Sequence, residues 1–180
     1  MINHVELGGD EALAIVQTEE GHFADLKSTQ ISPAKLSRTI SAFANASGGD
    51  LFIEIDEDTR TGAREWNGFA TQEDANACIA VFENIYPLSD GMRIQFFSGP
   101  QHPGLVLTVH CPKTQRIVHA SDGVAYLRRG AQNPPQKTDE RLRALELAKG
   151  VHTFEDETID IDKERLTKSQ ILRDFVNHVV

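Results

Sequence analysis

Three acidic residues, Asp56, Glu57 and Asp58, follow an apolar run near the middle of the chain. The run itself, 51–55, is rich in β-branched and aromatic residues and predicts a short buried strand. Carboxylates at the point where a strand leaves its sheet can converge on a substrate, or on a cation such as Mg²⁺, which prefers oxygen ligands. Such acids are equally typical of a solvated turn on an acidic chain, so this stretch alone leaves both interpretations open.

Basic residues are unevenly distributed along a chain whose net charge is −9. Residues 113–149 contain eight Lys and Arg against four Asp and Glu, whereas the segments on either side are acidic. Lys and Arg on adjacent strands and a flanking helix can neutralise phosphates, which is the dominant contribution to nucleic-acid binding. Solvated arginines and a core tyrosine are the alternatives. The candidates for nucleic-acid binding are Lys27, Lys35, Arg38, Arg128 and Arg129, with Tyr126 as a candidate for stacking on a base.

The composition is that of an ordinary globular protein, with 39% hydrophobic and 25% charged residues among 180, and it suffices for one domain with a small extension. No apolar run approaches the roughly 18 residues of a membrane span. The N-terminus lacks the basic start and apolar core of a secretory signal. Cys78 and Cys111 have no CxxC spacing, which argues against a disulfide framework or a zinc site. We therefore predict a cytoplasmic protein with no membrane partner.

Hydrophobic spacing and turn residues predict the elements that position these side chains. The main helix begins with Ser32 as N-cap and Pro33 in its first turn, and it runs to about Ala46. The fold class is therefore α+β or α/β, with a mixed sheet of about five or six strands and two or three helices packed on it. Further helices are predicted at 10–17, 71–84, 138–149 and 166–180, and strands at 23–27, 51–55, 92–97, 105–110, 116–119 and 124–128.

A helix end, a glycine turn and a strand follow one another over residues 40–58. The pair Gly48-Gly49 stops the helix, since glycine accepts the left-handed backbone of a helix C-terminus. Here and at several other positions the chain resembles the Schlafen-type AlbA-like domain, which is found in bacterial DNA-binding regulators and in Schlafen proteins. The most specific part of the resemblance is the S-A-F-A-N-x-x-G-G segment, 41–49. Between about Glu11 and Ala148 the other matching positions are Glu20, Asp25, Lys27, Asp56, Tyr126, Arg128 and Gly130.

The resemblance implies a Schlafen AlbA-like domain over residues 1–150 and a metal-dependent ribonuclease centre. In Schlafen nucleases an acidic triad occupies the places of Glu20, Asp25 and Asp56, so these three are the expected catalytic residues and ligands of Mg²⁺ or Mn²⁺. Such a metal activates water and stabilises phosphate oxygens during phosphodiester cleavage. The chain departs from the family at two positions. Asp25 replaces the usual Glu, and Glu54 stands where the family has glycine, where it either adds a ligand or spoils the pocket.

Three functions are therefore considered. The first is nucleic-acid binding, to RNA or DNA, within a bacterial regulator or a defence-type protein. The second is a metal-dependent endoribonuclease that acts on tRNA-like substrates, and the third is a protein-interaction or dimerisation module. Because family members often pair two lobes and this chain has a single copy, we predict a homodimer with one continuous groove. Residues 151–180 are expected to form an acidic linker and an amphipathic helix that lead into further chain or dock on a partner.

Overall fold

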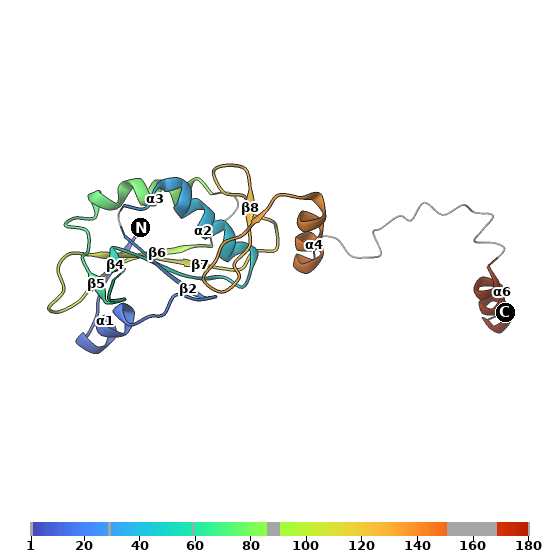
Figure 1. Cartoon of the computed structure of the whole chain (residues 1–180), viewed down its shortest axis with the longest axis horizontal. Helices are drawn as coiled ribbons and strands as arrows, with labels where there is room; N and C mark the ends of the chain where they lie inside the picture. The colour runs from blue at the N-terminus through green and yellow to red at the C-terminus, as the bar shows by residue number, and fades with distance from the viewer. Residues whose placement is uncertain (1, 29, 59, 86–90, 151–168, 180) are drawn as a thin grey trace.

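A mixed five-stranded sheet forms the centre of the computed structural model, which describes residues 2–28, 30–58, 60–85, 91–150 and 169–179 (Figure 1). The strands lie in the order β1-β6-β7-β3-β2. The outer pairs β1–β6 and β2–β3 are parallel, and the two inner pairs are antiparallel. This arrangement confirms the predicted α+β fold. The strands are β1 (Asn3–Glu6), β2 (Ala24–Lys27), β3 (Gly49–Ile53), β6 (Arg93–Ser98) and β7 (Val106–Cys111).

Two helices, α2 (Pro33–Asn45) and α3 (Asn76–Glu83), cover one face of this sheet (Figure 1). The inner face of α2 is apolar at helical spacing, and its side chains Leu36, Ile40 and Phe43 are fully buried. They pack in one cluster with alternate residues of the strands, because side chains of a strand point to its two faces in turn. This cluster is the main hydrophobic core.

The opposite face of the sheet is covered by α1 (Gly9–Val16) and by the hairpin of β4 (Ile55–Glu57) and β5 (Arg64–Trp66). Ala12 of the helix and Trp66 of the hairpin are buried in a second, smaller cluster. The hairpin carries Asp56 and so positions one of the three predicted catalytic acids.

Glu54 divides the predicted strand 51–55 into the separate strands β3 and β4. Its φ is +80°, a backbone conformation that side chains rarely adopt and glycine adopts freely, which explains why the family has glycine here. The Glu54 N–H donates to the Lys27 carbonyl at 2.8 Å, and its own carbonyl accepts from the Asn67 N–H at 3.1 Å. The Glu54 side chain is buried near Cys78, whose pKa is raised by burial and by this carboxylate. It does not line the pocket that contains Asp56.

Of the two strands predicted at 116–119 and 124–128, only Ala125–Tyr126 forms a strand. The two segments share one isolated bridge, His119 to Ala125, and β8 (Ala125–Tyr126) instead pairs with β9 (Pro135–Gln136). Proline lacks an N–H and reads as a chain break in sequence, but a two-residue edge strand tolerates it. Strand β1 was not predicted, because its four residues are mostly exposed and show no clear alternation.

The start of the predicted helix 71–84 is also displaced. Thr71 bonds to Asp74, with its N–H and its hydroxyl 2.9 and 3.0 Å from Asp74 Oδ2. A short 3₁₀ turn, η1 (Glu73–Ala75), nevertheless precedes α3. Such turns are frequent at the beginning of helices.

Two further helices follow the sheet, α4 (Asp139–Lys149) and α6 (Gln170–Val179). Helix α4 begins at the N-cap Thr138 and ends at Gly150, whose φ is +70°, as the sequence predicted. Helix α6 agrees with the predicted helix 166–180 over its described part, and the acidic segment 151–164 lies outside the described residues. Among the described helices, none is long and apolar enough to cross a membrane.

Candidate nucleic-acid interface

Residues 41–45 form the last part of helix α2, and their side chains hold strand β8 against this helix by hydrogen bonds. The Ser41 hydroxyl donates to the Val118 carbonyl at 2.7 Å and accepts from the Tyr126 N–H at 3.0 Å. Asn45 Nδ2 donates to the carbonyls of Val118 and Tyr126 at 2.7 and 2.9 Å, and its Oδ1 accepts from the Val118 N–H at 2.8 Å. Ser41 and Asn45 are both buried, where backbone groups must find partners. The most specific motif of the sequence is therefore structural, and it fixes the strand that carries Tyr126.

Arg128 anchors the segment after β8 to the start of β2, and its side chain is 0% exposed. Its guanidinium donates to the carbonyls of Gly21 and Ala24, both at 2.9 Å, to Asn133 Oδ1 at 2.9 Å and to Asp25 Oδ1 at 3.2 Å. This burial does not agree with the predicted contact between Arg128 and a phosphate, because the side chain is 0% exposed and its guanidinium is occupied by these four groups. We therefore correct its role to a structural one.

Lys27 holds two of the three predicted catalytic acids. Its Nζ lies 2.8 Å from Asp25 Oδ2 and 3.3 Å from Glu20 Oε1. Burial raises the pKa of Asp25 against the opposing effect of Lys27 and Arg128. Burial also opposes ionisation of Glu20, but the Leu26 N–H and the Lys27 ammonium outweigh it, so the pKa of Glu20 is lowered. A divalent ion shared by these two carboxylates would have to displace the Lys27 ammonium.

Asp56 shares a pocket of about 320 Å³ with Glu20 but not with Asp25. Its Oδ2 accepts from Asn67 Nδ2 at 2.7 Å, whereas its Oδ1 is buried without a hydrogen-bond partner. In the described part of the chain, no three His, Cys, Asp or Glu side chains are grouped closely enough to hold a metal ion. The acids as arranged do not fit a three-carboxylate metal site, and the Mg²⁺ or Mn²⁺ centre stays a prediction.

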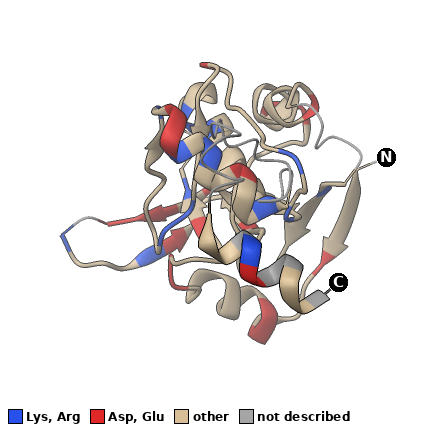
Figure 2. Ribbon diagram, turned by 90° about the vertical axis from the view of Figure 1, so that its right-hand side faces the viewer, with Lys and Arg blue, Asp and Glu red and all other residues tan. Residues whose placement is uncertain are grey.

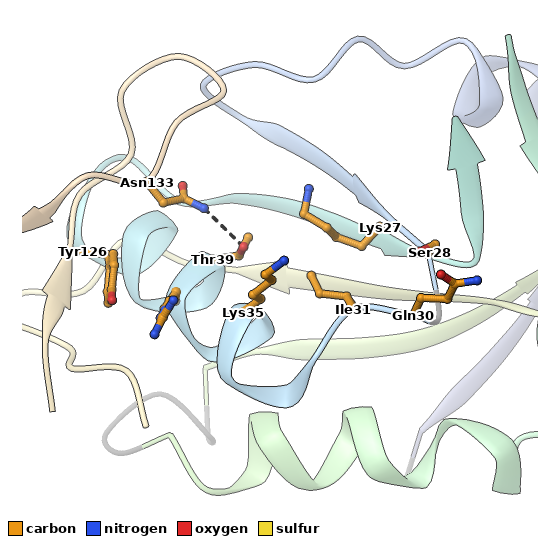
Figure 3. Close-up of a pocket in the computed structure, with 9 residues that line it drawn as sticks. Lys27, Ser28, Gln30, Ile31, Lys35, Thr39, Tyr126 and Asn133 are labelled. Carbon is orange, nitrogen blue, oxygen red and sulfur yellow. Dashed lines mark hydrogen bonds between the residues drawn. The ribbon is translucent and has the colours of Figure 1, made fainter. Parts of the chain in front are cut away.

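Four of the predicted nucleic-acid residues line one pocket of about 450 Å³. Figure 3 shows Lys27 extending from β2, Lys35 from the first turn of α2 and Tyr126 from β8. The first turn of a helix favours anions, because its free N–H groups and its dipole point toward them. The four residues are Lys27, Lys35, Arg38 and Tyr126, and the other described residues of the lining, Ser28, Gln30, Ile31, Thr39 and Asn133, are neutral.

Arg38 and Tyr126 form one hydrogen-bonded group at the edge of this pocket. Arg38 Nε lies 2.9 Å from Asp122 Oδ2, and the Tyr126 hydroxyl donates to the same oxygen at 2.8 Å. The Arg38 guanidinium also lies over the Tyr126 ring, 5.6 Å from its centroid. Tyr126 is only 7% exposed, so the core position considered from the sequence describes it better than base stacking does.

Arg129 does not lie where the sequence predicted, and Asn133 was not predicted as a site residue. Arg129, although adjacent to Arg128, is exposed and lines a different groove, described below. Asn133 was missed as a site residue, yet its amide connects the pocket to the buried arginine. It accepts from Arg128 and donates to the Thr39 hydroxyl at 3.2 Å (Figure 3). The only sequence signal there was the Asn-Pro dipeptide, which indicated a turn.

A family model described as Schlafen, AlbA_2 matches residues 20–137, more than half of the 180 residues. The chain belongs to this family. The AlbA_2 region includes every residue of the pocket and all three predicted catalytic acids. The resemblance inferred from the 41–49 motif is thereby confirmed.

Two solved structures are similar to this chain over about 70% of its length. The N-terminal domain of a protein related to the DNA helicase RecG, from Nitrosomonas europaea, has a TM-score of 0.50 at 17% identity, covering 70% of this chain and 90% of that one. A Corynebacterium diphtheriae protein has a TM-score of 0.48 at 15% identity, over 71% of this chain. The matched part is 25% of that protein's length. No curated protein matches the chain.

Lys149 follows the AlbA_2 region in the sequence, and its hydrogen bonds connect the end of α4 to the end of α2. Its Nζ donates to the carbonyls of Ala44 at 3.0 Å and Thr114 at 2.6 Å, and to the Thr114 hydroxyl at 3.1 Å. Burial, with a smaller effect of the neighbouring Lys113, lowers the pKa of Lys149 from 10.5 to about 8. The helix is therefore attached through a lysine that releases its proton more readily in the folded state than in the unfolded state.

We expect the difference in unfolding free energy between wild type and Lys149→Met to rise as the pH is raised from about 8 toward 10.5. In this window the unfolded state still binds the Lys149 proton and the folded state has released it, so raising the pH favours folding. Below the window both states are protonated and the difference is constant. Urea unfolding of both proteins across this range measures the difference. Cys111, whose pKa burial raises to about 12, is present in both proteins, and a flat difference would contradict the prediction.

Proposed function

We propose that this AlbA_2 domain binds nucleic acid through the pocket between β2, α2 and β8. The observation that carries the proposal is the convergence of Lys27, Lys35 and Arg38 on one pocket whose described lining contains no acidic side chain. Neutralisation of phosphates by such cations is the main, salt-dependent contribution to nucleic-acid affinity. The resemblance to the domain of bacterial DNA-binding regulators supports the same class of ligand.

The three cations differ in how freely they can meet a phosphate. Lys35 is exposed, and within the described residues no acidic side chain lies at ion-pair distance from it. The pair of Arg38 with Asp122 is solvent-accessible, with side chains 42% and 27% exposed, and such pairs contribute little to stability. Arg38 can therefore leave its ion pair with the Asp122 carboxylate and bind a phosphate at a small cost in free energy. Lys27 is balanced by two acids, so we assign most of the binding to Lys35 and Arg38.

Replacing Lys35 and Arg38 together by alanine is expected to weaken binding on the order of tenfold at low salt and to reduce the salt slope by about two, one for each lost phosphate contact. Fluorescence anisotropy with labelled tRNA and a labelled DNA duplex, repeated over a salt series, measures both quantities. The double variant Arg60→Ala/Arg93→Ala is the matched control, since it removes the same charge from exposed positions outside the pocket. An equal loss in the control would show that only net charge matters and would contradict a site at the pocket.

Metal-dependent ribonuclease activity is the second candidate. Its support is that the pocket of Glu20 and Asp56 shares Lys27 and Ser28 with the binding pocket, and that Asp56 Oδ1 is buried without a partner. Incubating the same RNA with Mg²⁺ or Mn²⁺, with chelator, and beside Asp56→Asn separates the two functions. Binding alone leaves the RNA intact in every sample. Cleavage that needs both the metal and Asp56 would instead make the domain a nuclease.

A protein-interaction or dimerisation module is the third candidate. The predicted homodimer, which would make one continuous groove, belongs to the nucleic-acid-binding function instead. Wild-type protein that binds neither RNA nor DNA in a salt-dependent way would favour this function over the other two. Light scattering of the purified chain gives its oligomeric state independently of any ligand.

A further inference from the structure

A second basic groove lies next to the binding pocket, with a volume of about 510 Å³. The two are separated by the hydrogen bond between Arg128, which lines the groove, and Asn133, which lines the pocket. Helix α4 forms one wall, and Figure 2 views the molecule from the end that carries this helix. The cations of the lining are Lys113, Arg128, Arg129, Arg141 and Lys149, and none of its described residues is acidic.

Three of these cations are available to a ligand. Arg128 and Lys149 donate to groups within the chain at the distances given above, and Arg141 makes one long contact, from Nη1 to the Pro135 carbonyl at 3.5 Å. Lys113, Arg129 and Arg141 are exposed, and among the described residues none of them lies at ion-pair distance from a carboxylate. The groove therefore presents three unneutralised cations over a lining that also includes the apolar side chains of Leu127 and Leu145.

An exposed aromatic pair adjoins this groove. His22 lines the groove, and its ring packs edge-to-face on Phe23 with the centroids 4.7 Å apart. His22 Nε2 lies 3.2 Å from the Ser47 hydroxyl, which orients the imidazole. Phe23 is 62% exposed, so its ring contributes little to either core and is open to a planar ligand. Cations beside an exposed aromatic ring are the combination with which proteins bind single-stranded nucleic acid.

We propose that this groove binds single-stranded nucleic acid, with Lys113, Arg129 and Arg141 contacting phosphates and Phe23 stacking on an unpaired base. The inference rests on the proposed function, since it extends the same polyanion from the pocket into the neighbouring groove. A base in a duplex is already stacked and paired, so it cannot use Phe23. The groove therefore gives the domain a preference for single strands, whereas phosphate contacts alone give none.

Anisotropy with a labelled oligouridine and with a labelled duplex of equal length tests this inference. We expect Phe23→Ala to weaken single-strand binding by about fivefold or more and to leave duplex binding unchanged. Phe23→Trp retains the ring and should retain affinity. Leu13→Ala is the matched control, because Leu13 is also a large exposed apolar residue, 49% exposed, on the separate helix α1. Arg129→Ala/Arg141→Ala should weaken single-strand binding and lower its salt slope.

The Lys35→Ala/Arg38→Ala variant in the same assay separates failure of the groove from failure of the pocket. If only the pocket variant loses affinity, the proposed binding at the pocket stands and the proposed binding at the groove is overturned. If the groove variants lose single-strand affinity and the pocket variant does not, binding at the groove is supported and the proposed binding at the pocket is overturned. A loss in Phe23→Ala that is equal on single strand and duplex, or no loss on either, also overturns base stacking at this position.

Discussion

Arg128→Leu is expected to lower the free energy of unfolding by about 3–5 kcal/mol, the range for removing one partner of a buried ion pair. The side chains of Arg128 and Asp25 are 0% and 2% exposed, so leucine leaves the Asp25 carboxylate with Lys27 as its one ion-pair partner among the described residues. The carbonyls of Gly21 and Ala24 lose their arginine donors at the same time. Chemical denaturation followed by circular dichroism measures the change.

The adjacent arginine provides the control for this experiment. Arg129 is exposed, so Arg129→Leu should change the unfolding free energy by no more than about 0.5 kcal/mol. Adding Asp25→Asn to Arg128→Leu removes the uncompensated charge and should recover part of the loss, which a double-mutant cycle measures as coupling. Similar losses for Arg128→Leu and Arg129→Leu, or no coupling between Arg128 and Asp25, would contradict the structural role assigned to Arg128.

Asn45→Ala is expected to cost about 2–4 kcal/mol, because it leaves buried backbone groups of two segments without partners. Asn45 bonds to both the N–H and the carbonyl of Val118 and to the carbonyl of Tyr126, and it is 3% exposed. The loss should reach function as well, because the same bonds hold strand β8, which lines the binding pocket. Thermal unfolding and the anisotropy assay on one preparation report both effects.

Asn45→Asp distinguishes hydrogen bonding from simple loss of volume. The carboxylate keeps the acceptor for the Val118 N–H but faces two carbonyl oxygens with no proton to donate, so the loss at neutral pH should exceed that of alanine. Asn84→Ala is the control, since Asn84 is exposed and, within the described residues, its side chain bonds to one group, the Ala80 carbonyl of the preceding helix. If Asn45→Asp were as stable as wild type, the 41–45 segment would not hold β8 in the way described.

Local patterns in the sequence were sufficient for much of the fold. Ser32 and Pro33 marked the start of α2, and Thr138 and Gly150 marked both ends of α4. Alternation of apolar residues located β2, and β-prone runs bounded by turn residues located β3, β6 and β7. These features depend on neighbours in sequence, so propensity and periodicity contain them. The positive φ of Glu54 and the strand β9 were not predicted. Glutamate rarely adopts a positive φ and a strand rarely begins at proline, so both differ from those local preferences.

The sequence by itself determined the fold class, the family and the set of charged residues from which a site is built. The tertiary structure alone decided which of them meet. Arg128 and Arg129 are neighbours of the same type, yet one is buried against Asp25 and the other is exposed beside a groove. This difference arises from the long-range bonds that hold β8 on α2, together with the pairing of β8 and β9, which set the face that each residue presents. The bonds between α2 and β8 join residues more than 80 positions apart, and no pattern confined to one stretch of sequence contains them.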